Sequence, residues 1–307
     1  MPKRFHLDRH ASWLLAAGLF AAAASGQETT PPAAFSHPDA RPALTSPGNA
    51  EWAPDVAFAR KRAAAQKKLV YYDIGGENCG DCRRMRGLLY PAFDFEALLI
   101  GMVPVQVKLE SPEGQELGKR YSITETPAVL ITTPEGRLVF QVQGFKDAPD
   151  FYRHAHKDID AYRKFAVVVD AQDVKTLSAE EAYSSGRALY ARLDFDAAAL
   201  RLQRAADAPG AKQELRESAL MGLAAAERQL GHMDAARGSA RKVAATTKNA
   251  DQKERAELFL VELDLSENRP GDALAAYKKF VKDHPESPYL EKVRSFIAKL
   301  EAAAPKS

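Results

Sequence analysis

The stretch YYDIGGENCGDCRRM, residues 71–85, decides how the first half of this chain is interpreted. It holds Cys79 and Cys82, which are the only two cysteines among 307 residues. Asp73 lies six positions before the first of them. A chain that is otherwise free of cysteine needs a reason to keep two thiols so close together, behind an apolar run and beside a lone acid.

The stretch also predicts its own local structure. The run KLVYYDI is rich in β-branched and aromatic residues and stops at Gly75-Gly76, as a strand followed by a tight loop does. From the first cysteine onward, Cys82, Met85 and Leu89 recur at helical spacing on one face. We therefore expect a strand, a short glycine loop and a helix that begins at the first cysteine.

Two cysteines three positions apart contribute little to stability. A disulfide that closes so small a loop removes little entropy from the unfolded chain. In an oxidising compartment such a pair can close into a disulfide, whereas in the cytosol it is more often catalytic or metal-binding. A reactive role explains the pair better than structural bridging.

The composition indicates a globular chain with length for about two domains. Hydrophobic residues make up 46% and charged residues 27% of the sequence. Its 43 basic and 41 acidic side chains give a net charge of +2. Because nucleic-acid binders need a concentrated basic field, this near-balance argues against nucleic acid as a partner.

Residues 1–26 have the features of a signal peptide. Basic residues precede the apolar run ASWLLAAGLFAAAASG, which is too short to span a bilayer stably, and small residues precede a cut before Gln27. Residues 27–50 are rich in Pro, Ala, Ser and Thr, so we expect a flexible tether. The sequence predicts a periplasmic or secreted protein with no stable membrane span after cleavage. An uncleaved membrane anchor is the alternative.

Residues 51–168 are expected to form one α/β domain. Strand patterns at KLVYYDI, MVPVQVKLE and TPAVLITTPEGRLVFQVQGF alternate with helical patterns, and the last contains the turn Pro134-Glu135-Gly136. The predicted order is helix, strand, helix, strand, helix, strand, strand, helix. Strands separated by helices and followed by a hairpin indicate a mixed central sheet with helices on both faces.

Residues 169–307 are expected to form an all-α domain of tetratricopeptide-like helical repeats. Ala198, Ala236 and Ala273 mark three helix-turn-helix stretches separated by 38 and 37 residues, near the repeat period of about 34. The final stretch SPYLEKVRSFIAKLEAAA would be a capping helix. The middle unit is irregular, with Glu227 where a large apolar residue is usual, so a plain helical bundle is the alternative.

Residues 51–168 resemble a thioredoxin-like domain, in particular the exported branch whose active helix reads C-x-x-C-x-x-M. The C-x-x-C spacing alone is a weak signal, but here it stands in register with other family landmarks. In chain order the landmarks are Asp73, Cys79, Cys82, Lys108, Thr126-Pro127 and Gly144. Together they favour the fold strongly and a redox function with it.

The resemblance implies a role for each polar landmark. Cys79, at the N-terminus of its helix, would attack or be attacked by a partner protein, and the less exposed Cys82 would resolve the mixed disulfide. Asp73 would take or give the proton of Cys82, and Lys108 would pair with that acid. The alternative is that Asp73 is an ordinary surface carboxylate, in which case it would not transfer the proton of Cys82.

The pair Thr126-Pro127 matches the substrate-binding loop of the family. The resemblance implies a cis peptide bond before Pro127 and a backbone presented to a substrate chain for β-type pairing. Without the resemblance, an ordinary trans proline would be expected, because cis bonds are rare even before proline.

The site departs from the family pattern in its charges. Asn78 stands where tryptophan is usual, and Gly80-Asp81 replaces the familiar Gly-Pro. Asp81 opposes a thiolate on the first cysteine, whereas Arg83 and Arg84 favour it. A less stabilised thiolate favours the disulfide form, so the sequence favours a reductant, although oxidant and isomerase remain alternatives.

A metal site is a weaker interpretation of the same residues. Zinc usually takes four protein ligands, and His154 and His156 lie on a polar helical stretch where solvation is expected. We therefore expect no bound metal and no cofactor beyond the redox disulfide, with electrons exchanged through an external partner protein. Cu(I) on the two thiolates remains an alternative, because soft sulfur ligands select it.

The favoured function is that of an exported thiol–disulfide oxidoreductase with a part in cell redox homeostasis. It would act on the thiols and disulfides of substrate proteins through Cys79 and Cys82, exchange electrons with a redox partner, and bind a protein partner on its helical repeats. The alternatives are a non-catalytic periplasmic scaffold and a Cu(I)-handling thiol protein.

Overall fold

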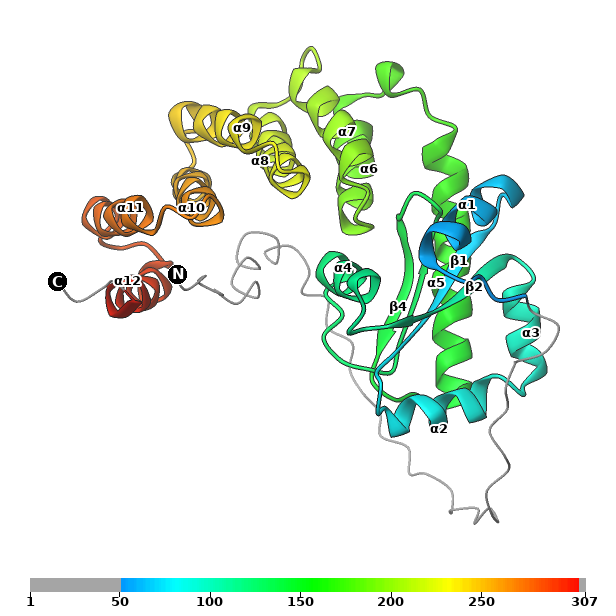
Figure 1. Ribbon diagram of the computed structural model, residues 1–307. Coiled ribbons are helices and arrows are strands. Elements are labelled where there is room, and N and C mark those ends of the chain that lie inside the picture. Colours follow the sequence, from blue (N-terminus) through cyan, green and yellow to red (C-terminus); the bar gives the residue numbers. More distant parts are fainter. Residues whose placement is uncertain (1–50, 304–307) are drawn as a thin grey trace, which may run out of the picture. The chain divides into compact units, whose positions relative to one another are not determined.

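The computed structural model describes residues 51–303, and Figure 1 shows their path. The described residues divide into two compact units: 51–177 with 184–198, and 178–183 with 199–303. The predicted signal peptide and tether lie outside the described residues. Between residues 51 and 303, no helix combines the length and the apolar character that a membrane span requires.

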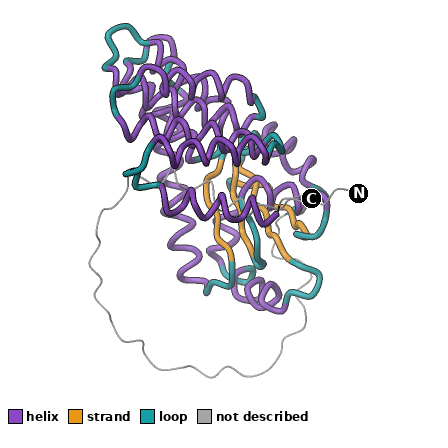
Figure 2. Tube along the Cα trace, turned by 90° about the vertical axis from the view of Figure 1, so that its left-hand side faces the viewer, coloured by secondary structure: helices purple, strands orange, loops and turns teal. Residues whose placement is uncertain are grey.

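The first unit is built on a four-stranded sheet with the strand order β2-β1-β3-β4. Strand β1 is parallel to β2 and antiparallel to β3, and β3 is antiparallel to β4, so the predicted mixed sheet is confirmed. Figure 2 shows the strands side by side in orange. The elements are α1 Val56–Gln66, β1 Leu69–Gly75, α2 Gly80–Leu89, α3 Phe93–Leu99, β2 Met102–Lys108, α4 Pro112–Tyr121, β3 Ala128–Thr132, β4 Leu138–Gln143 and α5 Ala148–Asp170.

Helix α3 was not predicted from the sequence. Helix α2 ends at Leu89, and Pro91 follows, whose ring cannot continue a helix. The chain then starts a separate seven-residue helix, Phe93–Leu99, that buries Phe95 and Leu98 against the sheet. The predicted order is therefore correct except for this additional helix before β2.

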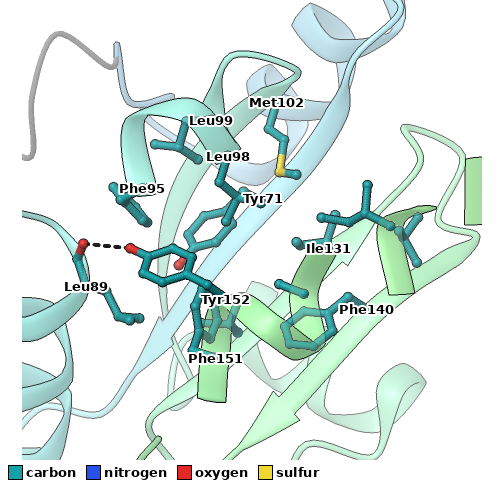
Figure 3. Close-up of a cluster of buried hydrophobic side chains, with 14 of the residues drawn as sticks. Tyr71, Leu89, Phe95, Leu98, Leu99, Met102, Ile131, Phe140, Phe151 and Tyr152 are labelled. Carbon is teal, nitrogen blue, oxygen red and sulfur yellow. Dashed lines mark hydrogen bonds between the residues drawn. The ribbon is translucent and has the colours of Figure 1, made fainter. Parts of the chain in front are cut away.

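Helices cover both faces of the sheet, as expected. Helices α2, α3 and α5 pack on the face to which Tyr71 of β1 points, and α1 and α4 pack on the opposite face with Val70 and Tyr72. In the first cluster, drawn in Figure 3, the hydroxyl of Tyr152 donates to the carbonyl oxygen of Leu89 at 2.8 Å. This bond connects the end of α2 to α5, so it helps to hold the helix that carries the cysteines in place.

The β3–β4 hairpin confirms the predicted turn and meets a later segment of the chain. Gly136 has a φ of 97°, a left-handed conformation that glycine adopts at little cost. The backbone N–H of Leu138 donates to the carbonyl oxygen of Arg192 at 2.7 Å, and Arg192 Nη1 donates back to that of Leu138 at 3.1 Å. Residues 192–194 thus belong to the first compact unit, although they lie well beyond α5 in the sequence.

From the end of α5 to residue 303 the chain has no strand and is mostly helical, as predicted. After a short 3₁₀ turn at Val174–Thr176, seven helices follow: α6 Ala179–Ala191, α7 Phe195–Asp207, α8 Gln213–Leu230, α9 Met233–Thr246, α10 Ala250–Ser266, α11 Pro270–Asp283 and α12 Leu290–Ala303. The landmark alanines Ala198, Ala236 and Ala273 have no exposed surface, as small residues at helix crossings should. Helix α12 occupies the stretch that was predicted to be a capping helix.

Several contacts in this part of the chain share one sequence spacing. Arg228 of α8 pairs with Glu262 of α10 at 2.8 Å, and Arg255 of α10 donates to the hydroxyl of Tyr289 at 2.9 Å. The two residues of each pair are 34 positions apart. A spacing that recurs in this way is what a stack of similar helical hairpins produces.

Candidate functional site

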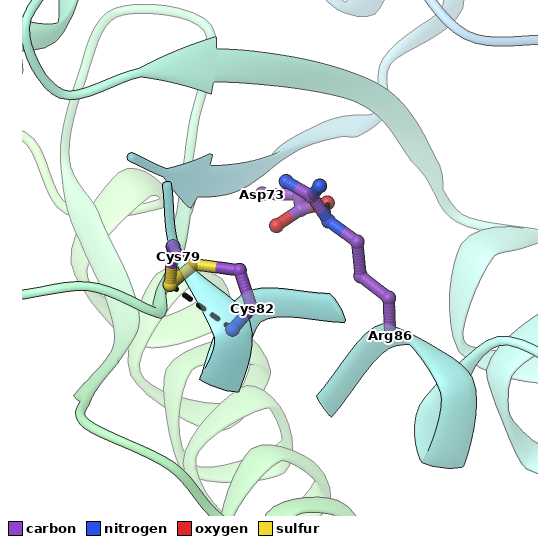
Figure 4. Close-up of a disulfide and its surroundings, with 4 residues drawn as sticks. All are labelled: Asp73, Cys79, Cys82 and Arg86. Carbon is purple, nitrogen blue, oxygen red and sulfur yellow. Dashed lines mark hydrogen bonds and ion pairs between the residues drawn. A yellow bond between two sulfur atoms is a disulfide. The ribbon is translucent and has the colours of Figure 1, made fainter. Parts of the chain in front are cut away.

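Cys79 and Cys82 form a disulfide at the start of α2, with their Cα atoms 5.2 Å apart (Figure 4). Cys79 is the N-cap residue, and its Sγ accepts a hydrogen bond from the backbone N–H of Cys82 at 3.0 Å. Cys79 is partly exposed, whereas Cys82 is only 2% exposed. The expected difference in exposure between the two sulfurs is therefore confirmed.

The position of Cys79 favours its ionised form once the disulfide is reduced. The first backbone N–H groups of a helix have no partner within the helix, and the positive end of the helix dipole lies there. The sulfur of Cys79 already accepts a hydrogen bond from one of these groups, the backbone N–H of Cys82. A thiolate at this position gains a hydrogen bond and a favourable field without any rearrangement of the backbone.

Asp73 is buried in the sheet, 5% exposed, on the face that α2 covers. Its Oδ2 accepts hydrogen bonds from Nε of Arg86 at 2.7 Å, from the hydroxyl of Tyr90, and from Nε2 of Gln106 at 3.4 Å. Within the described residues, every hydrogen bond to the side chain of Asp73 ends on this one oxygen. Oδ1 is therefore left for another donor.

The pKa values of Arg86 and Tyr90, which both donate to Asp73, are raised. Arg86 therefore forms an ion pair with this carboxylate, and Tyr90 is a neutral hydrogen-bond donor to it. Burial lowers the pKa of Arg86, but the charge and hydrogen bond of Asp73 outweigh it, and the net pKa is raised. Burial, and then the charge of Asp73, raise the pKa of Tyr90 well above its usual value. Arg86 therefore stays cationic and Tyr90 stays protonated throughout the neutral range.

The structure corrects the predicted partner of Asp73. Lys108 lies at the end of β2 and pairs with Glu77 at 3.6 Å, and both side chains are largely exposed. The physical reason is register: Asp73 lies opposite Gln106 in the parallel pairing, and Lys108 lies opposite Gly75, two residues further along. The cation that pairs with Asp73 is instead Arg86, a residue of α2.

The loop at Thr126-Pro127 lies at the same end of the sheet as the disulfide. The peptide bond before Pro127 is cis, as the resemblance implied. Strand β3 begins opposite Ile74, so Pro127 lies beside the end of β1. A Cβ built on Gly76 would lie 3.3 Å from Oγ1 of Thr126 and 3.8 Å from Cβ of Cys79, which places both around the same point.

The rim of the site carries charges of both signs. Oε1 of Glu110 would lie 3.0 Å from a Cβ on Gly76, so this carboxylate is close to the first cysteine. The guanidinium of Arg84 stacks over the ring of Phe145, with 4.4 Å between its Cζ and the ring centroid. Asp81, in the first turn of α2, is exposed. Glu110 is therefore a carboxylate beside Cys79 in addition to the predicted Asp81.

The histidines considered as metal ligands lie elsewhere. His154 and His156 are both exposed on α5. Within residues 51–303, no three side chains of the types His, Cys, Asp and Glu are arranged to hold a metal ion.

Sequence reasoning missed two residues of the site, Arg86 and Tyr90. Both lie on the face of α2 that carries Cys82, since positions 82, 86 and 90 are each four apart. That spacing was available in the sequence. It was not used because a basic residue on a helix is far more often solvated than buried.

A family model and several solved structures are similar to part of this chain. The family model described as thioredoxin-like domain matches residues 56–157. Among solved structures, a thioredoxin from Thermus thermophilus is 25% identical, with a TM-score of 0.30, covering 32% of this chain and 79% of that chain. A putative disulphide-isomerase from Bacteroides thetaiotaomicron is 26% identical, with a TM-score of 0.31, covering 34% of this chain and 86% of that chain.

A DsbH oxidoreductase is 17% identical, with a TM-score of 0.33, covering 44% of this chain and 95% of that chain. No curated protein matches the chain. The family match covers the segment that folds as the mixed sheet and carries the cysteine pair with the cis-proline loop. Residues 56–157 are therefore a thioredoxin-like domain.

Proposed function

We propose that this protein is an exported thiol–disulfide oxidoreductase that acts on the thiols and disulfides of other proteins through Cys79 and Cys82. One observation carries the proposal: the cysteines form a disulfide at a helix N-terminus, with the first sulfur partly exposed and the second buried. This arrangement separates an attacking thiol from a resolving thiol.

The reaction needs two exchanges and no bound cofactor. In the reducing direction, the Cys79 thiolate attacks one sulfur of a substrate disulfide, forms a mixed disulfide and releases the first substrate thiolate, which takes a proton. Cys82 then loses its proton and attacks the sulfur of Cys79. This attack closes the Cys79–Cys82 disulfide and releases the second substrate thiol. The substrate gains two electrons from the protein dithiol, and an external redox partner later supplies two other electrons that reduce the Cys79–Cys82 disulfide again.

Asp73 is placed to move the proton of Cys82. Its Oδ2 is occupied by Arg86, Tyr90 and Gln106, and none of these bonds uses Oδ1. A carboxylate held by one oxygen keeps the other available for proton transfer, directly or through water. In the opposite direction of the reaction, the same oxygen would return the proton.

The loop at Thr126-Pro127 is the proposed binding edge for the substrate chain. Proline has no N–H to offer, but the carbonyl and N–H of the residues around it can pair with an extended peptide. Thr126 and Cys79 border the same point beside Gly76, so a chain paired with this loop would lie across the exposed sulfur. Lys108 and Glu77 form an exposed ion pair at the rim of this surface. Lys108 would contribute a positive charge to the binding surface, and it would not be the partner of Asp73.

The favoured direction is reduction of substrate disulfides. Asp81 and Glu110 place negative charge near Cys79 and oppose its thiolate, whereas Arg83 offsets only one of these charges and Arg84 is engaged by Phe145. A less stabilised thiolate makes the disulfide the favoured form of the pair, which is the property of a reductant. Equilibration with a glutathione redox buffer measures this property directly. We expect a reduction potential below the value of about −270 mV typical of thioredoxin.

The helical part is proposed to be a tetratricopeptide-like array that binds a protein partner. Helix contacts at a spacing of 34 residues support a repeat architecture, as in Arg228–Glu262 and Arg255–Tyr289. Such arrays bury their core between neighbouring hairpins and leave a surface free to grip a peptide or a domain. Export is supported by residues 1–26, and fractionation of cells expressing the full chain tests it.

Trapping tests the catalytic proposal. Cys82→Ala should accumulate mixed disulfides through Cys79 in cells that export the protein, because the captured partner is no longer released. The Cys79→Ala/Cys82→Ala double variant is the matched control and should capture nothing. The wild type should also reduce insulin when supplied with a dithiol. If Cys82→Ala traps no partner and insulin is not reduced, the protein is a scaffold that keeps the fold for binding.

A further inference from the structure

We propose that Arg86 is a positioning residue that sets the charge of the buried pocket beside Cys82, so that this cysteine can lose its proton when it resolves a mixed disulfide. The inference rests on the proposed function and names a part of the site to which no role has been assigned above. It gives the pocket a cation from α2, in place of the lysine expected from β2.

The geometry brings the guanidinium and the resolving sulfur to the same place. A Cβ built on Gly75 would lie 2.9 Å from Nη2 of Arg86 and 3.5 Å from Sγ of Cys82. The two atoms are therefore roughly 6 Å apart or less, within the range at which an opposite charge favours an ionised group. Figure 4 shows Arg86 reaching back along α2 toward Asp73, beside the disulfide.

The guanidinium is fixed by its second contact. Nε donates to Oδ2 of Asp73 at 2.7 Å, and only about a third of the Arg86 side chain is exposed, at 32%. An arginine so held keeps its charge at all physiological pH values and loses little further entropy on meeting an anion. The cation is thus in place before Cys82 ionises.

Other charged groups near the pocket do not replace this cation. Strand β1 contributes Asp73, which is an anion, and α2 contributes Tyr90, which stays protonated. At the rim, Lys108 of β2 is engaged by Glu77 and largely exposed. Gln106 is uncharged, as is Thr126 of the cis-proline loop. In the first turn of α2, the exposed charges of Asp81 and Arg83 oppose each other.

Loss of the Arg86 charge would therefore leave the pocket without a compensating cation. Burial favours the uncharged form of the Cys82 thiol, so without a cation beside it the cysteine would keep its proton. A tenfold smaller thiolate fraction, partly offset by the greater nucleophilicity of a more basic thiolate, slows the exchange by about threefold. A larger loss of thiolate extends this to about tenfold.

The experiment separates the two exchanges in time. The reduced full chain is mixed with one equivalent of a symmetrical nitrobenzoate disulfide, each half of which is coloured once it is released as a thiolate. Attack by Cys79 releases the first half and leaves the second on its sulfur. Attack by Cys82 then closes the protein disulfide and releases the second half. The protein dithiol loses two electrons, and the reagent gains them.

We expect Arg86→Gln to slow the second release by about three- to tenfold at neutral pH and to leave the first unchanged. The deficit should shrink as the pH rises, because Cys82 then ionises without help. Arg86→Lys keeps the charge and should recover most of the rate. Arg163→Gln is the matched control: its guanidinium lies 4.0 Å from a Cβ built on Gly101, beside the start of β2, and both releases should be unchanged.

Gly75→Ala keeps the inference testable if Arg86→Gln does not fold. The added methyl group would lie 2.9 Å from Nη2 of Arg86, would push the guanidinium away from Cys82, and should slow the second release in the same way. A second release as fast as that of the wild type in both variants would overturn the inference, as would a deficit that is the same at every pH. If the wild type itself shows no first release, the proposed function fails instead.

Discussion

Tyr90 donates its hydroxyl to Oδ2 of Asp73, the same carboxylate oxygen that Arg86 contacts. The ring of Tyr90 packs against Phe95, with 4.6 Å between the centroids. Tyr90→Phe therefore keeps the ring packing and removes only the hydrogen bond from the hydroxyl to the buried carboxylate. Hydrogen bonds to charged groups are worth about 1.5–3 kcal/mol. We expect Tyr90→Phe to lower the free energy of unfolding by about 2 kcal/mol, measured by urea denaturation.

Tyr152→Phe provides the matched control for that variant. Tyr152 is also 7% exposed, like Tyr90, but its hydroxyl donates to a neutral acceptor, the carbonyl oxygen of Leu89. A bond to a neutral acceptor contributes about 1 kcal/mol. If Tyr90→Phe costs no more than Tyr152→Phe, the hydroxyl of Tyr90 does not stabilise the charge of Asp73.

Tyr121 gives the protein a defined sensitivity to alkaline pH. Burial raises the pKa of Tyr121 to about 12, and its hydroxyl donates to the carbonyl oxygen of Gly136 at 2.8 Å. Because the folded value lies above the unfolded value near 10, the stabilisation is complete below about pH 10 and is lost as the pH rises toward about 12. One such proton changes the free energy of unfolding by up to about 1.4 kcal/mol per pH unit.

Urea unfolding of the wild type and Tyr121→Phe across this pH range checks the sign. The wild type should be the more stable of the two below about pH 10, and its advantage should shrink by about 2–3 kcal/mol toward about pH 12. A difference that stays constant over the range would show that Tyr121 ionises equally in the folded and unfolded chains.

Gly114 holds the end of β2 in position and should tolerate no side chain. A Cβ there would lie 2.0 Å from the carbonyl oxygen of Lys108 and 2.7 Å from Cα of Leu109, both backbone atoms. We expect Gly114→Ala to cost about 3 kcal/mol or more, because the backbone that carries Lys108 must shift. Gly87→Ala, inside α2 with no atom beyond its own stretch of helix backbone within 4 Å of the added Cβ, should instead stabilise by about 0.5–1 kcal/mol. Thermal unfolding of both variants distinguishes a steric from a general glycine effect.

The strand, loop and helix around the cysteines could be predicted because each has a local cause. The helical face of Cys82, Met85 and Leu89 depends on spacing alone, and all three are buried in α2. The hairpin turn depends on glycine at residue 136, which has a positive φ. The cis bond at Pro127 followed from the family resemblance and not from the sequence pattern.

The partner of Asp73 could not be predicted from spacing along the chain. Which residue of β2 lies beside Asp73 is set by the register of two strands separated by α2 and α3, and the structure places Gln106 there. Helix α3 was missed because seven residues after Pro91 give too short a pattern to separate from a loop. In both cases the deciding contacts are tertiary, and local propensity carries no information about them.

Arg137 connects β4 to a segment more than 50 residues later, and this connection should contribute to the stability of the first unit. Its Nε donates to Oδ2 of Asp194 at 2.8 Å and its Nη1 to Oδ1 of Asp170 at 3.1 Å. Burial lowers the pKa of Arg137, but the two carboxylates outweigh it and raise the net value. Arg137→Met keeps the length of the side chain and leaves Asp194, 20% exposed, without its cation.

We expect Arg137→Met to lower the free energy of unfolding by about 2 kcal/mol, less than for a fully buried pair because solvent still reaches the carboxylates. Arg153→Met is the control, since Arg153 forms an exposed pair with Asp150 on α5 and should cost below about 0.5 kcal/mol. Hydrogen exchange should also become faster in residues 192–194 of the Arg137 variant alone. Equal losses in the two variants would mean that the bridge to Asp194 does not hold this segment, and that the backbone bonds between Leu138 and Arg192 suffice.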